Sequence, residues 1–551
     1  MAAAVLDPGA QSTLTLGPVA ALKPKRAARF APSVACPQPL HPKLAQRRLL
    51  PEVVLSASST MSDACVKSLA AAWGLHAGTS KVITFGTACS GSELYTLCLA
   101  PLADRLSALT GCNVSFHHVW ACELSARKRD WIRSNFKPDH LFRDLKEVAT
   151  GQAWDVVDGE DETLRRHVPV PAVDILVAGF SCKDASRLNI HHKVRLDAVE
   201  KGAWTTGSTF EAFMKLLGGM TPRPRLCLLE NVPGLADRDK TTGRSSLDAV
   251  HDAFKGQGYL FVHKKFNASD TGIPSSRPRL YMAALAGLSA IDDGDAVIGR
   301  IHSNLLEMLS NLPPRPISQF LLDEYMPDNY STDEMITDWV PEMRKRLAQA
   351  AGASAPAPKH KRVISRLARS STAGIGRKST AGTGKGMGST GSGEGKNKKK
   401  GRNMTWAACP HKRDKAVYLA DLNGNPWFEV LTAIQKDVLL LNLCQHPYPG
   451  LQVGVVTVMT SPKFSRICRD KFPCQVPNAK FWILGHNRLQ TGAEALMLQG
   501  ADLVDIPTFG IGAGRKWSNA FLQDLAGNAF CIYQFLVWLL ACLPHIPHEA
   551  Q

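Results

Sequence analysis

The sequence predicts an α/β fold, in which a parallel sheet carries helices on both of its faces. Between about Val82 and Gly287, short apolar runs alternate with helix-like stretches, and this alternation is typical of βαβ units. Several runs end in Gly or a polar group, as buried strands of parallel sheets do. The six expected strands are Lys81–Phe85, Ser115–Cys122, Val173–Ala178, Leu226–Leu229, Tyr259–Lys264 and Leu280–Leu285.

Composition divides the 551 residues into four parts. Residues 1–78 contain scattered Pro and Ala without a sustained period, which predicts a basic, disordered N-terminal segment. Residues 79–287 hold the alternating runs. Residues 288–490 include a Gly-, Ser- and Lys-rich insertion at 352–403, predicted to be disordered because it has little apolar surface to bury. Residues 491–545 predict helices, and Phe530–Leu543 is too short to span a bilayer and predicts a buried helix.

Two segments carry the positive charge of the chain. Residues 1–51 have seven Lys or Arg and one acid, and residues 354–403 have thirteen and one. The formal net charge is +17, so the rest of the chain is nearly neutral. Such basic segments can bind phosphate backbones without sequence preference. A solubilising tail or a localisation signal explains them equally well.

The cysteines and the basic runs indicate a compartment. Fourteen cysteines include no Cys-x-x-Cys pair, which argues against a structural zinc module or a disulfide framework and favours reduced thiols, with no metal. The runs Lys396–Lys400 and Lys23–Arg26 favour the nucleus, while the acid-poor N-terminal segment also fits a plastid or mitochondrial transit peptide. We expect a monomer without membrane association.

Cys182 and Glu230 form the most informative pair in the chain. Cys182 follows the run Val173–Ala178, and Glu230 follows Leu226–Leu229. Reactive groups of parallel sheets collect at the carboxyl ends of the strands, so the two side chains are predicted to face one crevice. A thiol and a carboxylate together suit nucleophilic addition to a pyrimidine ring with a proton supplied on the other side. For Cys182 alone, a buried inert thiol is the alternative.

Read in order, the motifs resemble those of the DNA cytosine-5 methyltransferase family. The family has Gly-Phe-Pro-Cys-Gln, Glu-Asn-Val and Gly-Val-Pro-Gln-x-Arg-x-Arg. This chain has Gly179-Phe180-Ser181-Cys182-Lys183, Glu230-Asn231-Val232 and Gly272-Ile273-Pro274-Ser275-Ser276-Arg277-Pro278-Arg279. The resemblance implies that Cys182 is the nucleophile, that Glu230 acts at N3 of cytosine, and that Arg277 and Arg279 orient Glu230 and the base carbonyl. Lys183 and a helix beginning near Asp184 are expected to favour the thiolate.

Other motifs resemble the family's cofactor site for S-adenosyl-L-methionine. They are the glycine-bearing turn Phe85–Glu93, Ala121-Cys122-Glu123, Phe142-Arg143-Asp144-Leu145 and Gly527-Asn528. The turn departs from the family's denser Phe-x-Gly-x-Gly-Gly. The resemblance implies that Glu123 accepts the ribose hydroxyls and Asp144 reads the adenine amino group. The cofactor residues it implies are Phe85, Gly86, Gly91, Glu123, Asp144 and Asn528.

The resemblance implies a Rossmann-like methyltransferase sheet with an inserted target-recognition domain. Residues 79–287 would then be catalytic, 288–490 would recognise the target, and 491–545, with the family-like segment Glu494–Gly500, would complete the catalytic domain. The implied reaction moves a methyl group from S-adenosyl-L-methionine to carbon 5 of cytosine in duplex DNA through a covalent Cys182 adduct. One alternative is an RNA substrate, namely transfer RNA. Another is a catalytically silent DNA-binding scaffold, suggested by the departures at Ser181, Lys183 and Ser275.

Overall fold

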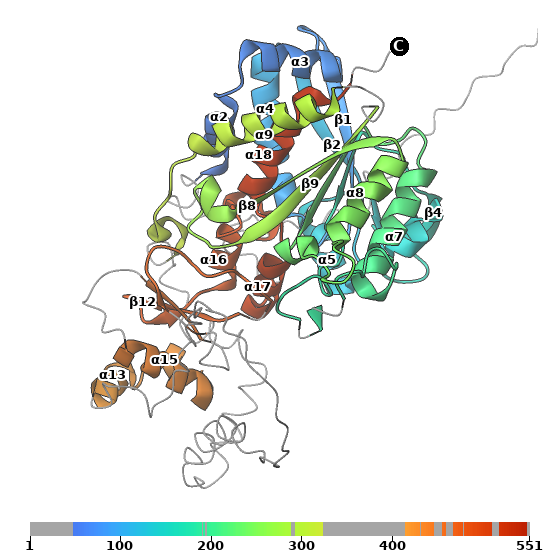
Figure 1. Cartoon of the computed structure of the whole chain (residues 1–551). Helices are drawn as coiled ribbons and strands as arrows, with labels where there is room; N and C mark the ends of the chain where they lie inside the picture. The colour runs from blue at the N-terminus through green and yellow to red at the C-terminus, as the bar shows by residue number, and fades with distance from the viewer. Residues whose placement is uncertain are drawn as a thin grey trace, which may run out of the picture.

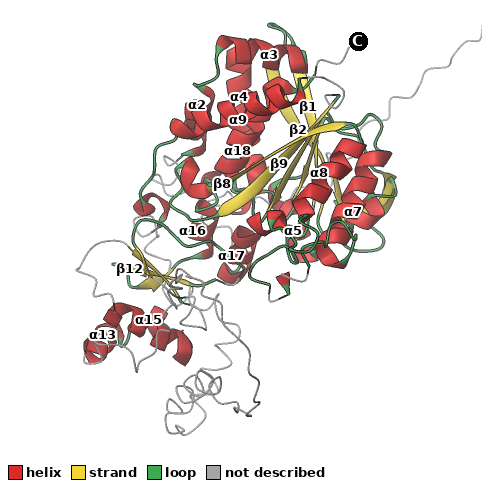
Figure 2. Cartoon of the chain, viewed as in Figure 1, coloured by secondary structure: helices red, strands yellow, loops and turns green. Residues whose placement is uncertain are grey.

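A nine-stranded sheet between two layers of helices forms the main body of the protein (Figures 1 and 2). The computed structural model describes residues 48–189, 191–192, 195–287, 293–322, 414–429, 431–445, 454–458, 465, 467–477, 479–509 and 517–547. The strand order is β5-β4-β3-β2-β1-β6-β7-β9-β8. The strands are β1 (Ser80–Ala88), β2 (Asn113–Cys122), β3 (His140–Phe142), β4 (Gln152–Asp155), β5 (Arg166–Pro169), β6 (Ile175–Ala178), β7 (Leu226–Asn231), β8 (Tyr259–Asn267) and β9 (Pro278–Ala286).

The α/β fold and all six predicted strands are confirmed, with one correction to the direction of β9. Strands β3, β2, β1, β6 and β7 pair in parallel. Strand β9 pairs antiparallel with both β7 and β8, so these last two runs are not a βαβ unit. The connection between Asn267 and Pro278 is too short for a helical crossover, and a short connection joins antiparallel neighbours. The sequence did not reveal β3, β4 and β5, because they are three or four residues long.

Alternation along the central strands explains why helices cover both faces. Ile175 and Val177 of β6 belong to one buried cluster, while Leu176 and Ala178 belong to the other. Successive side chains of a strand point to opposite faces, so a run that is apolar throughout requires cover on both sides. The continuous apolar run therefore specifies a central position in the sheet.

Each face of the sheet has its own set of helices. The first cluster includes residues of α2 (Leu50–Ser58), α3 (Asp63–Trp73), α4 (Leu99–Thr110), α5 (Ala126–Asn135), α9 (Gly294–Ser310) and α18 (Ile532–Cys542). The second includes residues of α6 (Leu145–Val148), α7 (Trp204–Gly219) and α8 (Ser246–Gly256). In Figure 1, α7 and α8 lie on the opposite side of the strands from α18.

The prediction of disorder over residues 1–78 is wrong for its last part, because α2 and α3 are folded onto the body. Leu50, Val53, Val54 and Ala57 are buried at helical spacing, and the carboxylate of Asp502 accepts a hydrogen bond from the Leu50 N–H at 2.8 Å. This apolar period covers only nine residues. Tertiary packing rather than local propensity stabilises so short a helix. Residues 1–47 lie outside the described residues.

Helix α18 is the central helix of the first cluster, as predicted for Phe530–Leu543. Every residue of α18 is buried, and it contacts α9 and α2. The stretch Asn519–His545 is apolar and long enough to cross a membrane by length and composition, but 94% of its most apolar window is buried inside the fold. Burial by protein on all sides identifies a core helix.

A small domain is formed by the described residues between 414 and 489. Its four-stranded sheet has the order β11-β10-β12-β13, and its helices lie beside this sheet at the lower end of Figure 1. The elements are α13 (Asp414–Leu422), α14 (Pro426–Glu429), α15 (Ala433–Gln445), β10 (Gly454–Thr457), β11 (Ile467–Cys468), β12 (Phe481–Leu484) and β13 (Arg488–Leu489). The insertion 352–403 lies outside the described residues.

The helices after the small domain return the chain to the main body. They are α16 (Gly492–Met497) and α17 (Asn519–Asn528), followed by α18. The buried carboxylate of Glu494 accepts hydrogen bonds from the Arg488 guanidinium and from the Leu322 N–H. A buried ion pair with all its partners in place fixes the geometry of the segments that supply them. Glu494 thus joins both chain connections of the small domain to the body.

We predict that Gly86→Ala destabilises the fold by about 2 kcal/mol. A Cβ atom at Gly86 would lie 2.3 Å from Cε2 of the buried Trp120, and a tightly packed core cannot move aside without cost. Urea denaturation measures the free energy of unfolding. Gly256→Ala, at a helix end where a Cβ meets nothing within 4 Å, is the matched control and changes stability by less than about 1 kcal/mol. Equal effects of the two substitutions would contradict this account.

Candidate active site

The ends of β1, β2 and β3 bring together most of the predicted cofactor residues. The carboxylate of Glu123, just after β2, accepts hydrogen bonds from the N–H groups of Gly91 and Ser125, both at 2.9 Å. Glu123 and Asp144 both raise the pKa of the Cys89 thiol, after burial as the main cause, to about 12. Gly91, Cys89, Glu123 and Asp144 therefore surround one position at the carboxyl edge of the sheet, where α/β folds bind ligands.

The link between α17 and α18 closes this position from the other side. A Cβ atom at Gly91, which has φ +62°, would lie 3.6 Å from the backbone oxygen of Asn528. A Cβ atom at Gly179 would lie 2.8 Å from the Phe530 ring and 3.5 Å from the Cys89 oxygen. The two glycines let these backbone segments approach closely around this position, which we call the cradle. The structure thus brings Asn528 to Gly91, as the resemblance implies.

Two of the predicted cofactor residues do not reach this cradle. Phe85 is buried within β1, where its ring stacks on His118 with centroids 4.4 Å apart. Gly86 leaves space for the indole of Trp120. Both residues precede the turn and belong to the packed sheet. Their contacts are those of the packed sheet, whereas Gly91 turns the chain, and their assignment to the cofactor site stays a prediction.

Glu93 lies beneath the turn and was not singled out by sequence. Its side chain is fully buried, and Thr87 donates a hydroxyl hydrogen bond to it. Ser90 in turn binds the backbone oxygens of Thr87 and Cys122. Burial raises the pKa of Glu93 to about 7, although hydrogen bonds from neighbouring hydroxyls oppose the shift. The turn is therefore folded around a carboxyl group that is easily protonated.

Cys182 and Glu230 lie at the ends of neighbouring parallel strands, as predicted. Strands β6 and β7 pair with Ala178 opposite Leu229, so Cys182 follows the end of one strand and Glu230 the same end of the next. Asn231 connects the two segments, since its side-chain amide donates to the backbone oxygen of Phe180 at 3.1 Å. The Cys182 thiol is partly buried, and the negative charge of Glu230 acts on it. The two groups therefore lie at the same edge of the sheet, where the charge of Glu230 acts on the thiol.

Arg279 forms an ion pair with Glu230, with Nε 2.8 Å from Oε1. In the antiparallel β7–β9 ladder, Glu230 lies opposite Tyr281, which makes Arg279 its diagonal neighbour on the same face. Burial raises the pKa of the Glu230 carboxyl, and Arg279 and Arg277 oppose this shift without cancelling it. A buried carboxyl held by one arginine can both accept and supply a hydrogen bond.

Arg277 is placed differently from Arg279. Its guanidinium is fully buried and donates to the backbone oxygens of Gln475, Gly527 and Ala529. It therefore contacts the small domain and the C-terminal helices, and within the described part of the chain it makes no hydrogen bond to Glu230. The expectation that both arginines bind Glu230 directly is wrong for Arg277, which acts on Glu230 and Cys182 only through its charge.

Cys474 is a second thiol at this site that sequence analysis did not identify. Its Sγ lies 3.8 Å from Nη1 of Arg279. Its segment pairs with the turn before β9, because Ser276 N–H donates to Phe472 O at 2.8 Å and Phe472 N–H donates to Pro274 O at 2.7 Å. No signal in the sequence near Cys474 indicated this contact, which depends on how the small domain returns to the sheet.

The surroundings of the Cys182 thiol differ from the prediction that a helix would follow it. Residues 183–189 form turns, and the next helix, α7, begins at Trp204. Burial and the charge of Glu230 raise the pKa of Cys182, while Arg279 and Arg277 lower it without cancelling the rise. The prediction of a stabilised thiolate is therefore wrong for this state of the protein.

The loop after Cys182 is held against the loop after Glu230. A Cβ atom at Gly234 would lie 2.0 Å from the Ala185 oxygen. Asp237 forms ion pairs with Arg187 and with His192, whose Nε2 lies 2.8 Å from its carboxylate. The two catalytic motifs are thus packed together beyond the ends of their strands.

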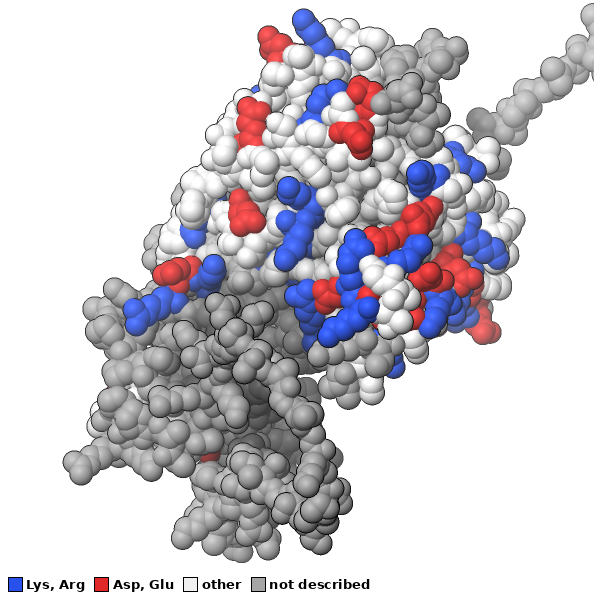
Figure 3. Space-filling model, in the orientation of Figure 1, with Lys and Arg blue, Asp and Glu red and all other residues white. Residues whose placement is uncertain are grey.

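Charges of both signs alternate on the face of the main body shown in Figure 3. Around α8, Arg244 pairs with Asp252 and Arg238 with Asp248. Paired charges largely cancel beyond a Debye length. The described residues of the main body on this face therefore produce no single-sign field that would attract a phosphate backbone over a distance.

Comparisons with known proteins identify the family. The model of the C-5 cytosine-specific DNA methylase family matches residues 108–407, more than half of the chain. The chain belongs to this family. The match begins after β1, so the role of the turn at Gly91 rests on its geometry.

Individual relatives agree with this family. The chain is 26% identical over 453 residues to the DNA (cytosine-5-)-methyltransferase DMT5 of Cryptococcus neoformans var. grubii, covering 80% of this chain and 16% of that protein. It is 24% identical to DMT5 of Verticillium dahliae, covering 81% of this chain and 19% of that protein. The chain thus spans less than a fifth of the length of these relatives.

Shorter bacterial relatives and solved structures also match. The type II methyltransferase M.MspI of Moraxella sp is 30% identical over 129 residues, 23% of this chain and 28% of that protein. Among solved structures, the S. pombe Dnmt2 methyltransferase aligns over 84% of this chain and 98% of its own, with 11% identity and a TM-score of 0.35. The Entamoeba histolytica methyltransferase EhMeth gives 11% identity, the same coverage and a TM-score of 0.38.

We predict that Glu93→Gln removes a pH dependence of stability. The pKa of Glu93 in the folded protein is about 7, above the ordinary 4.5, so between these values the folded state holds a proton that the unfolded state has lost. Stability from this group therefore falls as the pH rises from about 4.5 to 7, by up to roughly 3 kcal/mol. Between pH 4 and pH 8, the free energy of unfolding of Glu93→Gln should rise by up to roughly 3 kcal/mol relative to that of wild type.

Denaturant unfolding at the two pH values measures the difference. Glu162→Gln, whose side chain is 91% exposed, is the control and leaves the pH profile of wild type unchanged. A parallel pH profile for Glu93→Gln and wild type would contradict the buried, proton-binding state of Glu93.

Proposed function

We propose that the protein transfers a methyl group from S-adenosyl-L-methionine to carbon 5 of cytosine in DNA. Membership of the cytosine-5 methylase family supports the reaction. The observation that carries the proposal is the edge of the sheet at which the Cys182 thiol lies beside the Glu230–Arg279 ion pair. Because the chain spans only part of its curated relatives, the substrate and reaction stand as proposals for this chain.

In this proposal Cys182 adds to carbon 6 of a cytosine that has been flipped out of the duplex. Glu230, held by Arg279, binds N3 and supplies the proton that the ring needs as its electron density rises there. The addition makes carbon 5 nucleophilic, and carbon 5 accepts the methyl group. The methyl transfer leaves S-adenosylhomocysteine. Loss of the carbon 5 proton to water and departure of Cys182 as a thiolate then restore the aromatic ring, and the proton on N3 returns to Glu230.

The residues at the ends of β1, β2 and β3 fit the cofactor. Glu123 is oriented by two backbone N–H groups, which leaves carboxylate lone pairs for the two ribose hydroxyls. Asp144 is proposed to accept the adenine amino group, and Gly91 and Asn528 to border the cradle. S-adenosyl-L-methionine supplies an electrophilic methyl group when it is bound there. Arg277 is proposed not to contact the substrate. It would hold the segments around Gln475 and Gly527 beside the site, through the backbone carbonyls that it binds.

The small domain is the proposed target-recognition region, and residues 491–545 are proposed to complete the catalytic domain. The small domain contacts the site through Cys474 and Arg279. Duplex DNA is the proposed substrate, in line with the names of the relatives, and the nucleus the proposed location. The basic runs that favour the nucleus lie outside the described residues. Competition between duplex DNA and transfer RNA in a methyl-transfer assay separates the two substrates.

We predict that Cys182→Ser abolishes methyl transfer but keeps cofactor affinity within about twofold. A hydroxyl at this position is too weak a nucleophile for the ring without a strong base beside it. Transfer of a tritiated methyl group to duplex DNA measures turnover, and calorimetry with S-adenosylhomocysteine measures binding. Cys65→Ser, in α3 and away from Cys182, is the control. Turnover like that of wild type in the Cys182 variant would exclude the covalent mechanism.

A 5-fluorocytosine oligonucleotide separates the enzyme from a silent scaffold. Fluorine at carbon 5 cannot leave as a proton does, so the Cys182 adduct persists after methyl transfer. We expect a stable covalent complex with wild type and none with Cys182→Ala. DNA binding without any adduct, and without methyl transfer to DNA or transfer RNA, would favour the scaffold.

We predict that Arg279→Gln lowers turnover by about 10²-fold or more. The substitution leaves Glu230 buried without its cation and removes the charge that most strongly opposes the raised pKa of Cys182. The pH needed for adduct formation should therefore move upward. The pH profile of single-turnover methylation measures both effects. Arg300→Gln, an exposed arginine of α9 paired with Asp293, is the matched control, and an unchanged profile in Arg279→Gln would contradict the assignment.

A further inference from the structure

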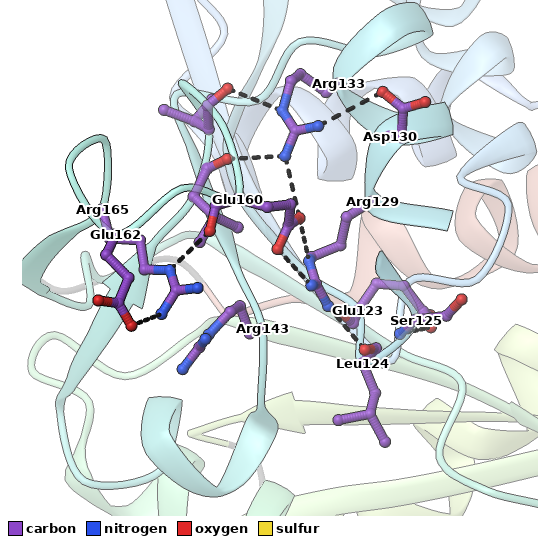
Figure 4. A network of polar contacts seen from close by, with 12 residues as sticks. Glu123, Leu124, Ser125, Arg129, Asp130, Arg133, Arg143, Glu160, Glu162 and Arg165 are labelled. Carbon is purple, nitrogen blue, oxygen red and sulfur yellow. Dashed lines mark hydrogen bonds and ion pairs between the residues drawn. The ribbon is translucent and has the colours of Figure 1, made fainter. Parts of the chain in front are cut away.

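A buried arginine ties the connection between β4 and β5 to the backbone beside Glu123 (Figure 4). Arg129, on α5, is 5% exposed. Its Nη1 donates to the backbone oxygens of Glu123 and Leu124, at 2.8 and 2.7 Å. The same guanidinium thus binds two consecutive carbonyls at the point where the chain leaves β2.

The other edge of the Arg129 guanidinium is paired with Glu160. Nε lies 2.9 Å from Oε1 and Nη2 lies 2.7 Å from Oε2, which is the two-point geometry that makes arginine–carboxylate pairs both strong and directional. The contacts of Arg129 with Glu160 and with the two carbonyls are therefore coupled through one rigid guanidinium. The carboxylate of Glu160 sets the plane of the guanidinium, and the guanidinium sets the two carbonyls.

Glu160 is itself held by two further arginines. Arg133 contacts Oε1 at 3.2 Å and donates to the backbone oxygens of Val156 and Val157. Arg165 Nε donates to the backbone oxygen of Glu160 at 2.9 Å. Burial raises the pKa of the Glu160 carboxyl, but Arg129 and Arg133 outweigh it and hold the pKa below its ordinary value. Glu160 is therefore ionised at neutral pH, and its segment has a fixed conformation.

The Glu123 carboxylate is the last group held by this series of contacts. The carboxylate is oriented by the N–H groups of Gly91 and Ser125, and Ser125 immediately follows the two carbonyls that Arg129 holds. A rotation of the Leu124 peptide would move the Ser125 N–H away from its acceptor. The structure assigns to the Arg129–Glu160 pair the role of positioning Glu123 for the ribose of the cofactor, with Glu160 acting at a distance from an edge hairpin of the sheet.

This role rests on the proposed function, because it presumes that Glu123 binds the cofactor ribose. Glu160 and Arg129 contact the backbone of the site, and their side chains are directed to each other rather than to the cradle. They are positioning residues. Removing the pair should weaken cofactor binding only insofar as Glu123 contributes to it.

The test is a double-mutant cycle on the full chain, with S-adenosylhomocysteine as the probe and calorimetry as the readout. We expect Glu160→Gln to weaken binding about tenfold, equivalent to about 1.4 kcal/mol, and Arg129→Lys to weaken it at least as much. In a Glu123→Ala background, Glu160→Gln should change affinity by less than about twofold, because the group that it positions is absent. The charge-conserving Glu160→Asp should recover part of the loss.

The matched control is Glu162→Gln, in the same segment, where the carboxylate lies 3.8 Å from Arg165 and is 91% exposed. It should bind like wild type. Thermal unfolding of each variant is measured alongside, and Glu160→Asp replaces Glu160→Gln in the cycle if the latter does not fold.

Two results would overturn the positioning role while leaving the proposed function intact. One is wild-type affinity in Glu160→Gln. The other is an equal loss in the presence and absence of the Glu123 carboxylate, which would indicate general destabilisation. Failure of wild-type protein itself to bind S-adenosylhomocysteine would instead overturn the proposed function.

Discussion

The buried guanidinium of Arg277 is the interaction on which the arrangement of the site depends. It lies just before β9 and binds backbone oxygens from the small domain and from the α17–α18 link. A buried cation is tolerated only where acceptors surround it. Three segments that are far apart in sequence must therefore meet at this one group. Their meeting brings Asn528 to the cofactor cradle and Cys474 to Arg279.

The antiparallel direction of β9 determines which arginine meets Glu230. It places Arg279 diagonally across from Glu230, where it forms an ion pair with the acid. Burial and the charge of Glu230 raise the pKa of Cys182 and outweigh Arg279 and Arg277, which lower it, so the neutral thiol is favoured. In the proposed reaction, a neutral Cys182 thiol in the resting protein can be reconciled with the need for a thiolate, because Glu230 is easily protonated. A proton held at Glu230 removes the charge that opposes thiolate formation at Cys182.

At the proposed cofactor site, at the ends of β1 and β2, buried side chains fix the backbone of the turns that carry Gly91 and Glu123. Gly91 turns the chain at positive φ, Ser90 ties the turn to β2, and the buried Glu93 fills its interior. Arg129 fixes the backbone at the end of β2 by donating hydrogen bonds to the carbonyls of Glu123 and Leu124. Polar groups buried in this way are costly unless each has its partner, and once satisfied they restrict the backbone to one conformation.

Much of the fold and part of the site could be predicted from the sequence, because they depend on local patterns. The apolar runs correctly predicted all six strands, including Val173–Ala178 as a buried strand of a parallel sheet. The order of elements placed Cys182 and Glu230 at the ends of strands that proved to be neighbours. Such inferences succeed because the period of a strand and the edge at which its reactive groups lie are properties of the chain itself.

What only the tertiary structure decided was which polar groups meet. The family resemblance implied the same role for Arg277 and Arg279, yet Arg279 binds Glu230 and Arg277 binds distant carbonyls. Phe85 and Gly86 matched a motif but lie in the packed sheet, and α2 is folded because Asp502, over 400 residues later, holds its first N–H. The sequence by itself determined the strands, the helices on both faces and the placement of Cys182 and Glu230 at neighbouring strand ends. Tertiary contacts decided the orientation, partners and protonation of those groups, because these depend on distances through space that no local pattern encodes.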